Sequence, residues 1–177
     1  MPQIIKHRDI INDDWVVVRA AEDGSLPAPH ELPAGPVLLP FEYWLTHAAS
    51  LAATRSARDL GVWLKPDTEP ADLVEHFAAF GVIAIDFPVF RDGRGYSIAR
   101  LLRDRYHWRG ELRAIGDVLR DQLFYMERCG FDAYAVRADK DLNNALLAFG
   151  ELTVRYQAAQ DEPNPLFRRR HAGAVPV

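Results

Sequence analysis

The sequence predicts an α/β fold of about five consecutive β-α units that form a parallel sheet, preceded by an N-terminal β-hairpin. Short apolar runs alternate with segments whose apolar residues have helical spacing, most clearly over residues 82–136. Almost no insertions separate these units, which favours right-handed crossovers and therefore parallel strands. A complete eight-fold β/α barrel typically needs about 250 residues, and the chain has 177. The sequence is therefore compatible with two architectures, an open sheet and an incomplete barrel.

Residues 1–36 do not follow the β-α alternation of the rest of the chain. Two β-prone runs, Ile4–Ile5 and Trp15–Val18, predict a hairpin within residues 1–22. Residues 23–36 contain four prolines, which disfavour regular structure and indicate a connector. We expect residues 1–157 to form a single α/β domain, because a chain of this length can bury a sizeable core.

The β-α repeats are expected over residues 37–157. The apolar runs predict strands at Val37–Leu39, Val62–Leu64, Val82–Phe87, Leu112–Ile115 and Ala133–Val136. Helical stripes predict helices over residues 41–54, 70–80, 96–106, 118–129 and 139–157. Residues 158–177 lose this periodicity, which is typical of a partly disordered tail.

Polar side chains gather where the predicted strands lead into helices, and parallel α/β folds bind ligands at that edge. The strongest candidate is the loop over residues 86–97, where Arg91 and Arg94 carry planar groups suited to sulfate, sulfite, phosphate or carboxylate. The helix that follows would direct its first N–H groups toward the same anion. Those groups belong to Gly95, Tyr96 and Ser97. The alternative is that the arginines pair with nearby aspartates and only fix a long turn.

Two aspartates are candidate catalytic residues, because each closely follows or ends a strand at this edge. Asp86 lies at the end of the third predicted strand, and Asp117 follows the fourth, where a helix N-cap is the alternative role. Arg113 interrupts that fourth strand, which is expected to be buried on both faces. It therefore lies at an edge or needs an anionic partner, and we count it among the candidate anion-binding residues. Lys65 and Arg137 follow two further strands and could line the same cleft.

Composition excludes several classes of function. The net charge of −4 gives no support to nucleic-acid binding, and no apolar run approaches the length of a membrane span. Cys129 is the one cysteine, so the chain alone cannot form a disulfide, a redox pair or a four-thiolate cluster. Its place before a helix-ending glycine indicates packing rather than a nucleophile. We expect no metal site, because no His-x-x-x-His spacing occurs, and we expect a cytoplasmic protein.

Residues 87–134 closely resemble a bacterial family of unknown function whose members are commonly labelled as oxidoreductases of sulfite reduction. The segments DGRGYS (92–97) and LRAIGDVLRDQ (112–122) carry the resemblance, which extends from about Val37 to about Tyr156. Genes of that family tend to lie beside assimilatory sulfite reductase. The resemblance implies a role in sulfate assimilation and cysteine supply, with sulfite reductase as the expected protein partner. The resemblance does not assign catalytic residues to this chain.

Three functions stay open at this point. The preferred one is an accessory protein of sulfite assimilation that binds an oxyanion or another anionic small molecule and docks on the reductase. The second is an enzyme acting on a phosphorylated or sulfonated small molecule, for which a flavin is an open cofactor. A usual nicotinamide site is not expected, because Ile98 stands where a dinucleotide fingerprint has its third glycine. The third is a non-catalytic scaffold whose polar edge is a subunit interface of a homo-oligomer.

Overall fold

The computed structural model describes residues 2–152 and 155–172. Within these residues the strands are β1 Gln3–Lys6, β2 Asp9–Asn12, β3 Val16–Val17, β4 Val37–Pro40, β5 Leu60–Leu64, β6 Val82–Phe87, β7 Glu111–Gly116 and β8 Ala133–Tyr134. The α-helices are α1 Phe41–Thr54, α2 Arg94–Asp104, α3 Arg120–Cys129, α4 Leu142–Leu146 and α5 Leu166–Ala172. Three 3-10 segments are η1 Pro29–Glu31, η2 Pro70–Ala79 and η3 Leu147–Gly150.

The described strands form one mixed sheet in the order β2-β1-β8-β7-β6-β5-β4-β3. From β3 to β8 neighbouring strands are parallel and follow the chain order, as five β-α units predict. The expectation of a purely parallel sheet is wrong, because β1 runs antiparallel to both β8 and β2. Only two residues join β1 to β2, and such a tight turn reverses the chain.

The sheet is curled into an incomplete barrel rather than spread open. Its two edge strands, β2 and β3, are joined by residues 13–15 alone. From Asn12 to Val16 the chain can span at most about 14 Å. The edges of a flat eight-stranded sheet would lie about 34 Å apart. The short link therefore holds the two edges near each other.

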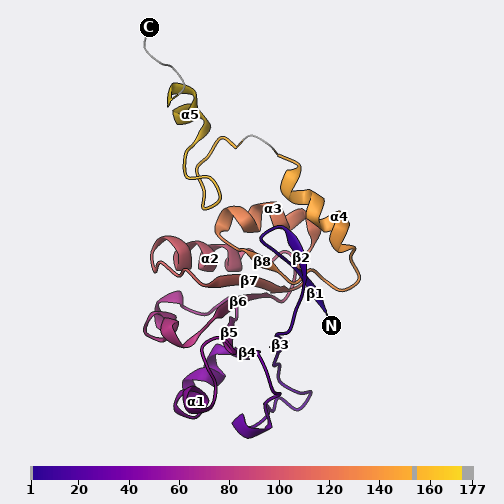
Figure 1. Cartoon of the computed structure of the whole chain (residues 1–177), viewed down its shortest axis with the longest axis vertical. Coiled ribbons are helices and arrows are strands. Elements are labelled where there is room, and N and C mark those ends of the chain that lie inside the picture. The colour runs from indigo at the N-terminus through magenta and orange to yellow at the C-terminus, as the bar shows by residue number, and fades with distance from the viewer. Residues whose placement is uncertain (1, 153–154, 173–177) are drawn as a thin grey trace.

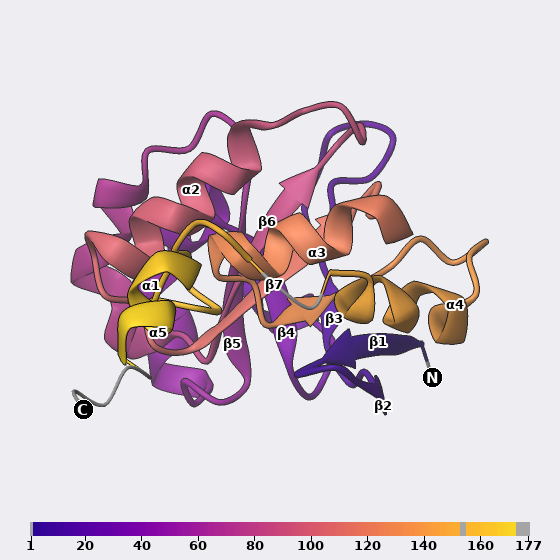
Figure 2. The ribbon, with the colours of Figure 1, turned by 90° about the horizontal axis from the view of Figure 1, so that it is seen from above.

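The two faces of the curled sheet are covered differently. Figure 1 shows α1, α2 and α3 around the outside, and Figure 2 shows the β1–β2 hairpin beside α4. The outer face of the strands packs against the helices, and Val62, Ile83, Ile85 and Leu112 are among its buried residues. On the concave face a second cluster joins Leu38, Trp63, Val82, Ala84 and Ile115. Trp15 and Val17 pack on this second cluster, so the N-terminal segment fills the barrel interior.

The N-terminal hairpin is confirmed, but its second strand is not the predicted one. Ile4 pairs with Ile11 in β2, whereas Trp15–Val18 leaves the hairpin and supplies β3 at the opposite edge of the sheet. The indole N–H of Trp63 donates to the carbonyl of Val18 at 2.9 Å, which fixes this crossing. The apolar pattern marks Trp15–Val18 as a strand but carries no information about its neighbour.

The buried arginine of β7, Arg113, finds its partner in the short link between β2 and β3. Arg113 is 2% exposed, and its Nη1 donates to both carboxylate oxygens of Asp13 at 2.9 Å. Its Nε donates to Glu111 Oε1 at 2.6 Å, and the guanidinium lies 5.8 Å from the ring of Trp15. The partner that the sequence required for Arg113 is therefore a pair of protein carboxylates, inside the barrel.

The long helix expected over residues 139–157 is wrong. The chain forms α4, then a 3-10 turn that ends at Gly150. Leu152 and Tyr156, which belong to the helical pattern, are both more than half exposed. Glycine disfavours a helix interior, and the pattern residues after Gly150 gain no burial that would offset this. The predicted helix over residues 70–80 is also replaced, by the 3-10 segment η2.

The tail contains more structure than its composition predicts. Residues 166–172 form α5, which Figure 1 shows beyond the body of the domain. Residues before it are tied to α3, because Asp161 accepts from Arg128 at 3.4 Å and lies 2.7 Å from Arg155. Residues 173–177 of the expected tail lie outside the described residues.

Candidate functional site

The carboxyl ends of the parallel strands carry ion pairs that connect neighbouring strands. Asp86, at the end of β6, is 8% exposed and accepts from Arg19 Nη2 at 2.6 Å. Asp117, after β7, accepts from Arg137 Nη1 at 2.8 Å, and Arg137 follows β8. The structure therefore brings both predicted carboxylates to one edge. Each carboxylate is held by an arginine, and no sequence pattern pointed to Arg19 as the partner of Asp86.

Gly116 lets the turn after β7 approach the end of β6 closely. Its φ is +92°, and a Cβ there would collide with the carbonyl of Phe87 and lie 2.8 Å from Asp86 Oδ1. The turn also directs the backbone N–H of Asp117 to the carbonyl of Phe87 at 2.7 Å. A left-handed backbone in such close contact admits only glycine. The close approach of β6 is therefore what requires a glycine at this position.

The loop between β6 and α2 is fixed from two sides. The backbone N–H of Phe90 donates to Asp117 Oδ2 at 3.1 Å. Its carbonyl accepts from the Nε2 of Gln122 at 2.7 Å. Both polar backbone atoms of Phe90 are thus bonded to the β7–α3 region, while its side chain is 54% exposed and that of Val89 is 45% exposed. We call residues 88–93 the clamped loop.

The two arginines predicted to bind an anion differ in their surroundings. Arg94 makes a bidentate pair with Asp92, at 3.0 Å from Nε and 2.7 Å from Nη2. This contact raises the pKa of Arg94 and lowers that of Asp92. Arg91 is exposed, and no carboxylate among the described residues lies within ion-pair distance of it. Arg91 is therefore the freer cation of the loop.

The residues predicted to bind an anion at the start of α2, and Arg113 in β7, have the following surroundings. Gly95 is buried, and a Cβ on it would lie 2.7 Å from the ring of Phe87, so it serves close packing of α2 on β6. Tyr96 packs on Phe87 and Tyr125, and burial raises its pKa. Tyr96 and Ser97 line an outer groove between α2 and α3. Arg113 lies inside the barrel, bonded to Asp13 and Glu111.

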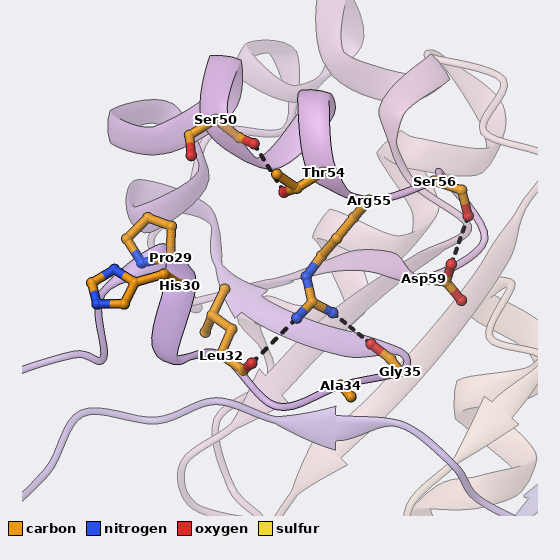
Figure 3. Close-up of a pocket in the computed structure, with 10 residues that line it drawn as sticks. All are labelled: Pro29, His30, Leu32, Ala34, Gly35, Ser50, Thr54, Arg55, Ser56 and Asp59. Atoms are coloured by element: carbon orange, nitrogen blue, oxygen red, sulfur yellow. Dashed lines mark hydrogen bonds between the residues drawn. The ribbon is translucent and has the colours of Figure 1, made fainter.

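Several hollows lie away from this edge and have structural explanations. Figure 3 shows the hollow between the proline-rich connector and α1, where the side chain of Arg55 hydrogen-bonds to the connector backbone. Its guanidinium donates to the carbonyls of Gly35 and Pro33, both at 2.6 Å, and so fastens the connector to the helix. A second hollow, near Arg8 and Glu127, contains the ion pairs that tie the hairpin and the C-terminal segment to α3.

A cavity of about 540 Å³ opens beside the edge, between the N-terminal segment and the chain that follows β8. We call it the seam cavity. Trp15, Val17 and Ile4 line it from the N-terminal segment, and Ala135 and Val136 line it from the chain after β8. Arg137 and Lys140 are the basic residues of the cavity. The Nε of Arg137 donates to Asp139, and the ammonium group of Lys140 forms an ion pair with the same carboxylate. These contacts hold the pKa of Asp139 well below its usual range. Sequence reasoning found neither Trp15 nor Lys140, because the seam joins segments far apart in the chain.

A family model described as a bacterial protein of unknown function (DUF934) matches residues 61–167. The chain belongs to the DUF934 family. The match covers the clamped loop, Asp86, Asp117 and the chain after β8, and leaves out the N-terminal segment that fills the barrel. No curated protein and no solved structure shows a significant match to the chain. Across the described residues, no helix is long and apolar enough to cross a membrane.

We expect Cys129 to be a slow thiol. It is 7% exposed, and burial raises its pKa, so little thiolate is present near neutral pH. Its reaction with a disulfide reagent at pH 8 should be at least about tenfold slower in the folded protein than in the same chain unfolded in urea. Equal rates in the two states would show an accessible, activated thiol and would contradict a packing role.

Proposed function

We propose that this protein is a cytoplasmic accessory protein of assimilatory sulfite reduction. It docks on sulfite reductase through the clamped loop and contacts an anionic group with Arg91 and Arg94. The resemblance of residues 87–134 to a family associated with sulfite reduction supports the pathway. The geometry of the loop supports the docking.

The observation that carries the proposal is the fixed backbone of Phe90 beneath an exposed side chain. A loop that is already ordered loses little conformational entropy on binding, which favours affinity. Exposed aromatic and arginine side chains are the types that dominate binding energy at protein interfaces. Val89, Phe90 and Arg91 form such a set at the tip of the loop.

The arginines give the docking surface a preference for negative charge. Arg91 is unpaired among the described residues, whereas the charge of Arg94 is largely balanced by Asp92. A carboxylate on the reductase, or a bound oxyanion such as sulfite, can therefore be held bidentately by Arg91. Arg94 would join it if Asp92 turned away.

A catalytic role for Asp86 and Asp117 is less well supported by their contacts. Asp86 accepts from Arg19, and Asp117 accepts from Arg137 and from Phe90. Those contacts hold neighbouring loops in place, so a structural role accounts for both carboxylates. An enzyme that uses Asp117 would lose its activity in the Asp117→Asn variant without loss of stability.

The test is binding of the purified chain to the cognate sulfite reductase by surface plasmon resonance. Phe90→Ser and Arg91→Glu should each weaken binding about tenfold or more, because each removes a central contact. Calorimetric titration of sulfite and phosphate into the free chain tests the anion separately, and Arg91→Ala should abolish the heat.

Leu147→Ser is the matched control. Leu147 is 65% exposed and lies in η3, so this substitution also removes an exposed apolar side chain but leaves the loop untouched. Its affinity for the reductase should equal that of the unmodified chain. No association of the unmodified chain at micromolar concentration, or equal losses in Leu147→Ser and Phe90→Ser, would overturn the proposed docking.

A further inference from the structure

The seam cavity is a place where the sheet divides. β1 and β8 pair only through Ile5 with Tyr134 and Lys6 with Ala133. One residue further, Ile4 and Ala135 no longer pair, and both line the cavity. Its volume of about 540 Å³ falls within the range of about 300–1,000 Å³ that is typical of small-molecule sites.

Backbone groups of the chain after β8 are directed into this division. The N–H of Ala135 donates to Ala114 in β7, so it points away from β1. Successive residues of an extended chain alternate in direction, so the N–H and carbonyl of Val136 point toward the β1 side. Among the described residues none forms a backbone hydrogen bond with Val136. A strand edge of this kind offers one donor and one acceptor side by side, which suits the polar edge of a heteroaromatic ring.

The walls of the cavity suit the faces of such a ring. Trp15 is partly exposed, and Ile4, Val17 and Leu142 add apolar surface. Aromatic side chains bind planar rings by offset stacking or by edge contact. Asp13 also lines the cavity, but both its oxygens accept from Arg113, so it offers little unbalanced negative charge.

The basic residues of the cavity lie on its exposed side. The side chains of Arg137 and Lys140 are 43% and 44% exposed, and the two cations share the single carboxylate of Asp139. Arg137 also pairs with Asp117. Lys140 has no second carboxylate within the described part of the chain, and an ammonium group can hold a phosphate as a point charge.

We propose that the seam cavity binds a planar heteroaromatic ligand that carries a phosphate, the chemistry shared by flavin and adenine mononucleotides. The ring lies between Trp15 and the chain after β8, its polar edge bonds to the backbone of Val136, and its phosphate contacts Lys140. This site is separate from the clamped loop and does not depend on docking to the reductase.

The test uses four probes with the purified full-length chain: flavin mononucleotide, riboflavin, adenosine monophosphate and inorganic phosphate. Flavin fluorescence follows the first two, and calorimetry follows the others. We expect saturable binding of at least one mononucleotide and no binding of inorganic phosphate alone. The relative affinities of the flavin and adenine compounds identify the ring.

Two variants place the ligand in the seam. Ala138→Trp fills the cavity from an exposed position, and it should abolish binding of the preferred mononucleotide without altering the circular dichroism spectrum. Lys140→Ala should weaken the mononucleotide about tenfold, and should change the affinity of the compound without phosphate less than about twofold.

Lys65→Ala is the matched control. Lys65 is a similarly exposed lysine that follows another strand, β5, and pairs with Glu42. Its mononucleotide affinity should be unchanged. No saturable binding of either mononucleotide at millimolar concentration would overturn the proposal, as would binding that survives in Ala138→Trp. Neither result bears on the docking of the clamped loop, which is measured with the reductase.

Discussion

Asp13→Ala is expected to lower the free energy of unfolding by about 3–5 kcal/mol, the usual cost of breaking a buried ion pair by removing one partner. The two partners, Asp13 and Arg113, are 8% and 2% exposed. In the variant Arg113 keeps Glu111 but loses both hydrogen bonds to Asp13. The link between the two edges of the sheet then loses its side-chain contact with β7. Urea unfolding followed by circular dichroism measures the change.

Asp14→Ala is the control for this prediction. Asp14 is the next residue, carries the same charge and is exposed, so its substitution should change stability by less than about 0.5 kcal/mol. Similar effects of the two substitutions would contradict the central role of the Asp13–Arg113 pair. A further comparison, Asp13→Asn, keeps a hydrogen-bond acceptor without the charge and should give an intermediate loss.

Gly116→Ala is expected to destabilise the protein by about 3 kcal/mol or more, which places it among the large effects of single substitutions. Part of the loss, about 1–2 kcal/mol, arises because an L-residue is strained at a positive φ. The remainder arises because the new Cβ would collide with the carbonyl of Phe87 and approach Asp86. Thermal unfolding measures the total.

Gly24→Ala separates these two contributions. Gly24 has a φ of +83°, close to that of Gly116, but no atom lies within 4 Å of the position that a Cβ would take. Gly24→Ala should therefore show the backbone strain alone. If Gly116→Ala is no worse than Gly24→Ala, the close approach of β6 to the turn after β7 does not constrain that position.

Local pattern was sufficient for most of the parallel strands. Val82–Phe87 was predicted with its observed bounds, and β4, β5 and β7 lie within two residues of their predictions. These strands are buried on both faces, so each appears as a continuous apolar run that needs no knowledge of its neighbours. The helix over residues 139–157 failed because an apolar stripe indicates burial only when another element covers it, and Leu152 and Tyr156 are more than half exposed.

The candidate site was predicted in part for a related reason. Parallel strands end at one edge, so the sequence could place Asp86 and Asp117 together before their partners were known. It could not show that Arg94 pairs with Asp92, or that Gln122 reaches the carbonyl of Phe90. Such contacts depend on side-chain directions and on loop paths, which no spacing rule contains.

By itself, the sequence determined the α/β class, the run of β-α units and the polar edge where the strands end, because all three follow from local hydrophobic period and chain direction. The tertiary structure alone decided that the sheet curls, that Trp15 and Val17 pack inside it, and that Arg113 forms an internal ion pair. Each of these depends on contacts between segments distant in the chain, such as Asp13 with Arg113. The physical reason is that burial and charge pairing depend on contacts between different strands and helices, whereas hydrophobic periodicity depends only on the residues of one segment.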